Sequence, residues 1–124
     1  MRRIAVLLLA LASFSTSASA QNVEVGTGLI CDTAEQVEEV AKLSNEGVGN
    51  QVAVEQVNAR AASNACGVLA VAYIKGEKGA TIRTKNGNAA IYQVLVVAVN
   101  LGAGWIQGQP LLQYTLFLTK EEDA

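Results

Sequence analysis

The stretch "GLICDTAEQVEEV", residues 28–40, places Cys31 directly before a helix start. Two overlapping capping boxes are present, each with a polar residue and its partner three positions later: Asp32 with Glu35, and Thr33 with Gln36. A helix from about Thr33 to Ser44 is predicted, because apolar residues then share one face at helical spacing: Val37, Val40 and Ala41. Cys31 is therefore expected immediately before the N-terminus of this helix.

A second helix is predicted from Gln51 to about Ala62. It follows "NEGVGN", residues 45–50, where Asn and Gly tolerate the turn conformations that end a helix. The inward-facing residues of this second helix are expected to be apolar: Val54, Val57, Ala61 and also Ala53. The only other cysteine, Cys66, then lies in "SNACGVLAV", just before a predicted strand.

From Cys66 onward the pattern is typical of strands, with apolar runs bounded by glycine and asparagine. Four strands are predicted: "GVLAVAYI" (67–74), "ATIRTK" (80–85), "AAIYQVLVVAV" (89–99) and "LLQYTLFLT" (111–119). "KGEKG" (75–79) is expected to separate the first two, and "KNGN" (85–88) to form a type I′ hairpin turn. The predicted class is α+β, with an N-terminal pair of helices followed by a four-stranded antiparallel meander. The alternative is an SH3-like partly closed barrel with N-terminal helices.

Residues 1–20 are typical of a Sec-type signal peptide. Arg2 and Arg3 form its charged start, Ile4–Ala12 its apolar segment, and Ala18-Ser19-Ala20 an A-x-A cleavage pattern. The apolar segment is far shorter than the roughly 18 residues that a membrane span requires. We therefore expect cleavage after Ala20 and no transmembrane anchor. Residues 21–124 are expected to form one small α+β domain in the periplasm or outside the cell.

The two cysteines are expected to pair, because export delivers the chain to an oxidising compartment. A Cys31–Cys66 disulfide joins residues 35 positions apart. Closing such a loop stabilises a fold by roughly 3 to 4 kcal/mol on the chain-entropy model. The alternative is a reactive Cys31 thiolate at the helix N-terminus. A C-x-x-C pair and histidine are both missing from the sequence, so we expect no redox motif, no zinc site and no cofactor.

The lack of histidine also excludes Ser-His-Asp and Cys-His catalysis, and we expect no catalytic residue and no enzyme activity. The alternative is a histidine-free hydrolase that uses carboxylates of the first helix: Asp32, Glu35 and Glu39. Helix capping and solvent exposure explain these three carboxylates without invoking catalysis.

The distribution of charge along the chain offers a candidate binding surface. Cleavage leaves 7 basic against 11 acidic residues, a net charge of −4, which argues against general nucleic-acid binding. Four of the basic residues lie on the predicted first hairpin: Lys75, Lys78, Arg83 and Lys85. They are candidates for binding an anionic glycan, a phospholipid head group or an acidic protein. The alternative is that lysine at strand edges only blocks aggregation.

Trp105, in the glycine-rich "GAGWIQGQP" (102–110), is a further candidate binding residue or else the lid of a small core. The function expected from these features is a small exported non-enzymatic domain. It would bind a macromolecular partner, act as an inhibitor or support the cell envelope.

Five short stretches are informative together: "CDTAEQVE" (31–38), Val57-Asn58, "ACGV" (65–68), "IYQVLV" (91–96) and "PLLQYTLF" (110–117). In combination they resemble a family of small exported bacterial proteins with no established activity. The resemblance covers nearly all of the chain after the signal peptide. It implies export and a common fold, and it carries over no activity and no site residue.

Overall fold

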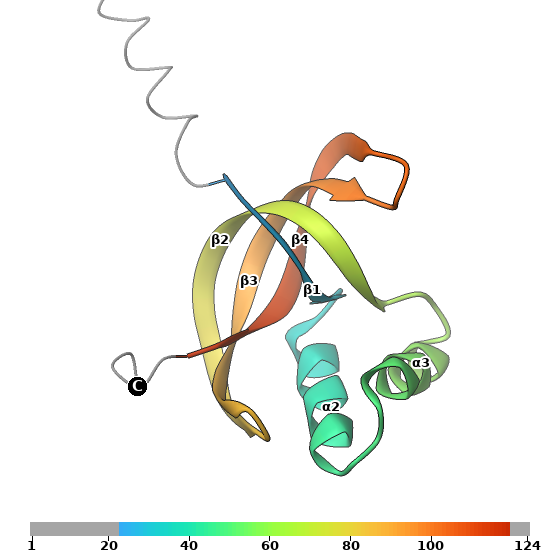
Figure 1. The fold of residues 1–124 in the computed structure, drawn as a ribbon, viewed down its shortest axis with the longest axis vertical. Coiled ribbons are helices and arrows are strands. Elements are labelled where there is room, and N and C mark those ends of the chain that lie inside the picture. The colour runs from blue at the N-terminus through green and yellow to red at the C-terminus, as the bar shows by residue number, and fades with distance from the viewer. Residues whose placement is uncertain (1–22, 120–124) are drawn as a thin grey trace, which may run out of the picture.

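The computed structural model describes residues 23–119, and the predicted signal peptide of residues 1–20 lies outside the described residues. Two helices and four strands make up this part of the chain (Figure 1). In chain order they are β1 (Val23–Cys31), α2 (Ala34–Asn45), α3 (Asn50–Ala61), β2 (Cys66–Thr84), β3 (Gly87–Asn100) and β4 (Trp105–Leu118). Neither of these helices has the length and apolar character needed to cross a membrane.

The α+β class, the two consecutive helices and a four-stranded antiparallel sheet are confirmed. The chain order differs from the prediction in two respects, because β1 precedes the helices and the predicted strands 67–74 and 80–85 are both part of β2, so that three strands follow the helices. Gly26 and Gly28 interrupt the apolar alternation of β1, so its local pattern does not indicate a strand. Long-range pairing builds it instead, since β1 lies antiparallel to β2 from Val23↔Ile74 to Cys31↔Cys66.

The segment at residues 75–79 is not a turn but the middle of the 19-residue strand β2. The pairing of β2 with β3 shifts register on both sides of Lys78. A Cβ atom on Gly76 would lie 2.7 Å from the carbonyl oxygen of Gln93, so the two backbones approach too closely for a side chain. The glycines of this segment therefore belong to an irregular, bulged strand pair.

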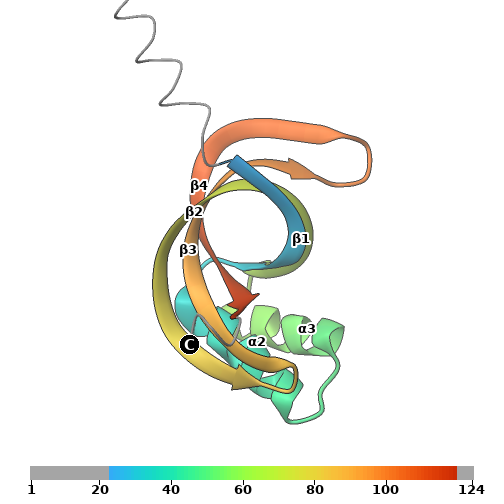
Figure 2. The same ribbon diagram turned by 60° about the vertical axis from the view of Figure 1, so that its left-hand side comes forward.

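The sheet closes on itself where the end of β1 meets β4 (Figure 2). Only two residue pairs form this junction, Ile30↔Thr115 and Cys31↔Tyr114. The Thr115 hydroxyl also donates a hydrogen bond to the carbonyl oxygen of Leu29 across it. The more specific SH3-like description of this closed sheet stays a prediction.

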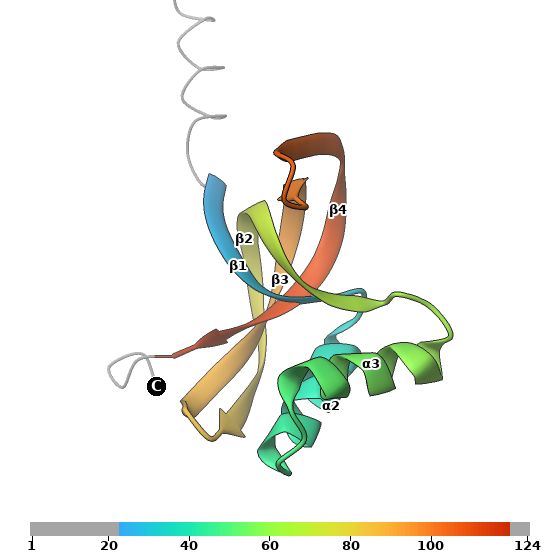
Figure 3. The same cartoon turned by 45° about the vertical axis from the view of Figure 1, so that its right-hand side comes forward.

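Two hydrophobic cores lie on the two faces of the sheet. The outer core lies between the helices and the sheet and contains Cys31, Val37, Val40, Ala53, Val57, Cys66 and Ile91. The inner core lies within the closed sheet and contains Ile30, Val71, Tyr73, Val94 and Val96. The helices thus cover one end of the sheet, and the β3–β4 hairpin projects at the other end (Figure 3).

The predicted disulfide between Cys31 and Cys66 is confirmed. The two residues are direct partners across β1 and β2, with their Cα atoms 4.1 Å apart. The next residues along continue the ladder, because the Asp32 N–H donates to the carbonyl oxygen of Ala65. The disulfide therefore joins the residue at the end of β1, before α2, to the first residue of β2, after α3, and so ties together the two ends of the helical pair.

The structure shows which residue caps α2 and which kind of turn joins β2 to β3. Thr33, and not Asp32, is the N-cap of α2, and its hydroxyl and the Gln36 side chain form the capping box. The hairpin at residues 85–88 is confirmed, but its type I′ form is not. A type I′ turn requires a positive φ at both of its central residues, here Lys85 and Asn86, and neither of them has one. Gly87, which follows them, has φ 122°.

Candidate functional site

Three of the four predicted basic residues lie on the sheet face opposite the helices. Their partners on β3 are alternate residues of that strand: Lys75↔Val94, Lys78↔Tyr92 and Arg83↔Asn88. The intervening Ile91 packs in the outer core beneath the helices. Because successive side chains of a strand point to opposite faces, the three basic residues share the face that continues the inner core.

Two aromatic rings lie among these cations. The Lys75 ammonium is 4.6 Å from the ring centres of both Tyr92 and Phe117. The two rings pack edge to face, with their centres 5.3 Å apart. Cation–π attraction of this kind contributes about 0.5 to 1 kcal/mol at exposed sites, so it holds Lys75 over the rings. We call the surface formed by Lys75, Lys78, Arg83, Tyr92 and Phe117 the basic face.

Lys85 and Trp105 occupy different places from the basic face. Lys85 lies in the two-residue turn between β2 and β3, next to the Arg83 end of the basic face. Trp105 begins β4 and pairs with Asn100 at the far end of β3. The 14 residues of β3 separate the two ends, a path of roughly 45 Å along the strand. The structure therefore does not bring Trp105 together with the basic residues.

The cations of the basic face have no carboxylate partner in the described part of the chain. The one ion pair within residues 23–119 joins Arg60 of α3 to Glu39 of α2. Lys75, Lys78 and Arg83 are exposed to solvent. Their charges are therefore available to an external anion.

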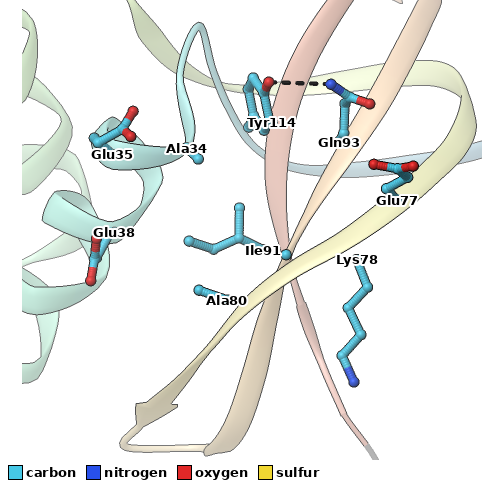
Figure 4. A pocket seen from close by; sticks show the side chains of 10 residues that line it. Ala34, Glu35, Glu38, Glu77, Lys78, Ala80, Ile91, Gln93 and Tyr114 are labelled. Carbon is cyan, nitrogen blue, oxygen red and sulfur yellow. Dashed lines mark hydrogen bonds between the residues drawn. The ribbon is translucent and has the colours of Figure 1, made fainter.

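A polar groove of about 350 Å³ lies on the other side of β2, against α2. Glu35 and Glu38 of α2 line one wall and Glu77 of β2 lines the other, while Lys78 extends away from it (Figure 4). At one end of the groove, the Gln93 side chain donates a hydrogen bond of 3.2 Å to the Tyr114 hydroxyl. Sequence reasoning did not single out Glu77, Gln93 and Tyr114, because only the packing of α2 beside the sheet brings them together.

The three carboxylates of the predicted hydrolase site do not share one cleft. Asp32 accepts a hydrogen bond of 3.2 Å from the Gln113 side chain of β4. Glu39 is paired with Arg60, and Glu35 alone of the three lines the polar groove. Within residues 23–119, no group of three or more His, Cys, Asp or Glu side chains is arranged to hold a metal ion.

Comparison of the chain with protein-family models, with curated proteins and with solved structures returned no match.

Proposed function

We propose that the protein is an exported, non-enzymatic binding protein whose basic face binds an anionic macromolecule. The observation that carries this proposal is the gathering of Lys75, Lys78 and Arg83 on one sheet face, around two aromatic rings and without carboxylate partners among residues 23–119. A net-acidic protein that keeps exposed cations together in this way offers a localised attractive field to an anion.

The spacing of the cations favours a polymer over a single small anion. Lys78 and Arg83 lie opposite Tyr92 and Asn88, which are four residues apart on β3, or about 13 Å along an extended strand. A chain of repeated anionic groups can place one group against each cation of the basic face, which a single phosphate or carboxylate cannot do. The half-buried rings of Tyr92 and Phe117 lie between the cations and offer an apolar surface to the same polymer.

The proposed location is the periplasm or the cell exterior. The Cys31–Cys66 disulfide is the feature of the described residues that supports it, because such bonds persist in oxidising compartments. The predicted signal peptide of residues 1–20 and the resemblance to small exported bacterial proteins are the sequence features that agree with it.

Isothermal titration of the exported protein with polygalacturonate, a linear carboxylated polysaccharide, tests the proposal. We expect binding that weakens with added salt, and a loss of roughly tenfold in affinity for Lys78→Glu, because the substitution puts a like charge against the ligand. Lys42→Glu is the matched control, since Lys42 is an exposed lysine of α2 and the change in net charge is the same. Equal weakening by both variants would show that net charge, and not the basic face, governs binding.

The polar groove supports a second candidate function, a hydrolase that uses carboxylates. Glu35 and Glu77 line opposite walls of it, and glycoside hydrolysis uses a pair of carboxyl groups that flank the bond to be broken. Hydrolysis of nitrophenyl glycosides that is abolished by Glu35→Gln and retained by Lys78→Glu would favour this candidate over the binding protein.

A further inference from the structure

The turn between β2 and β3 contains the one Asn-Gly pair of the sequence, Asn86-Gly87. Every other asparagine of the chain is followed by a residue that has a side chain. The difference matters because the backbone nitrogen of the next residue can attack the side-chain carbonyl of an asparagine. A side chain on that next residue hinders the attack, and glycine has none. Asn86 is therefore the asparagine of this chain that is most open to deamidation.

The structure leaves this pair unobstructed. Asn86 is exposed at the tip of the hairpin, and a Cβ atom on Gly87 would meet no atom within 4 Å. The Thr84 hydroxyl holds the turn, because it accepts a hydrogen bond from the Asn86 N–H and donates one to the carbonyl oxygen of Gly87. The side-chain amide of Asn86 forms no hydrogen bond with the described residues 23–119, so it is free to turn towards the Gly87 nitrogen.

The backbone of the hairpin requires glycine at position 87 but not asparagine at position 86. Asparagine is favoured in tight hairpin turns because it tolerates a positive φ. Asn86 does not have a positive φ, and the positive φ, 122°, falls on Gly87 instead. The conformation of the turn therefore does not account for the reactive side chain at position 86.

We propose that Asn86 is a site of spontaneous deamidation, and that the carboxylate so formed weakens anion binding at the basic face. The Gly87 nitrogen forms a bond to the side-chain carbonyl carbon of Asn86, and the C–N bond of the side-chain amide breaks. Ammonia leaves with the proton that the Gly87 nitrogen loses. Water then opens the resulting cyclic imide, giving aspartate by attack at the side-chain carbonyl or isoaspartate by attack at the backbone carbonyl.

Either product puts a negative charge at one end of the basic face. Asn86 directly follows Lys85 in the two-residue turn, and Arg83 of the basic face lies near the end of β2 that leads into this turn. A modification that changes charge acts through ordinary electrostatics, so the new carboxylate offsets a neighbouring cation and repels an anionic ligand. This effect on binding rests on the proposed function, whereas the deamidation itself does not.

Ageing the folded protein in mildly alkaline buffer tests the site, because loss of the proton from the Gly87 nitrogen speeds the attack. Trypsin releases residues 86–120 as one peptide, and its fragment masses separate Asn86 from Asn88. Relative to a fresh sample, we expect the small gain in mass that accompanies exchange of an amide for an acid at Asn86. Asn88 is the internal control, since it is also exposed but precedes Ala89. No gain at Asn86, or an equal gain at Asn88, would overturn the proposal.

Isothermal titration with polygalacturonate then compares fresh and aged protein. We expect ageing to lower the affinity by roughly two- to fivefold, which is the range that one exposed charge contributes, and Asn86→Asp to reproduce the loss without ageing. Asn86→Gln keeps an amide on a longer side chain that does not form the imide readily, so its affinity should survive ageing.

Equal affinities of the fresh protein and of the protein deamidated at Asn86 would overturn the effect assigned to the carboxylate. If the fresh protein does not bind polygalacturonate, the proposed function of the basic face fails. The peptide masses need no ligand, so they still decide whether Asn86 deamidates, and the two failures are distinguishable.

Discussion

Tyr73 is an ionisable side chain inside the closed sheet, where it is 8% exposed and donates a hydrogen bond to Glu24. Burial, and after it the charge of Glu24 and the hydrogen bond to it, raise the pKa of Tyr73 above its ordinary value of 10.0. The folded protein then keeps this proton after the unfolded chain has lost it. The stability linked to Tyr73 is therefore complete below the unfolded pKa and declines as the pH rises from there through the folded pKa.

Replacing Tyr73 by Phe is expected to remove that alkaline dependence, because phenylalanine has no proton to lose. Urea unfolding at about pH 9 and about pH 11 measures it. The parent protein should lose more free energy of unfolding between the two conditions than Tyr73→Phe does. Equal losses in the two proteins would show that Tyr73 does not couple ionisation to folding.

The disulfide is expected to supply a large share of the stability of this small domain. It joins Cys31 to Cys66 across 35 positions, so reduction should lower the free energy of unfolding by roughly 3 to 4 kcal/mol. Urea unfolding with and without dithiothreitol measures the effect. The double variant Cys31→Ala with Cys66→Ala is the control, because reductant should not change its midpoint. An unchanged midpoint in the parent protein would contradict the role assigned to the bridge.

At the scale of elements, the helices were predictable from sequence because their signals are local. Capping at Thr33 and apolar spacing predicted α2 and α3 to within a residue or two at each end. Strand β1 was not predicted, and β2 was predicted as two strands with a break at residues 75–79, because the glycines of these segments are explained only by the assembled sheet. Gly76 is needed because the carbonyl oxygen of Gln93 lies too close to it for a side chain, and the local sequence pattern does not show this contact.

The substitution Gly76→Ala is expected to destabilise the fold, because its Cβ would lie 2.7 Å from the Gln93 carbonyl oxygen and the two strands would have to separate. A loss of about 1 to 3 kcal/mol is typical of such overpacking. Gly28→Ala is the control, since a Cβ there would meet nothing within 4 Å. Thermal unfolding compares the two, and equal midpoints would mean that the bulged pair can relax.

At the scale of the molecule, charge and apolar surface are segregated. The helices carry an acidic surface, the basic face lies across the sheet from them, and the β3–β4 hairpin has no charge. The basic residues could be found from sequence because they cluster between Lys75 and Lys85. Their aromatic neighbours could not, since Tyr92 and Phe117 join them only through the register of β3 with β2 and β4.

The most direct test of the central claim is a ¹H–¹⁵N NMR titration of the protein with polygalacturonate. Binding at the basic face predicts that the amide shifts of Lys78, Arg83 and Tyr92 move together, while those of α2 stay in place. Shifts confined to α2 and the polar groove, or no shifts at all, would contradict the account.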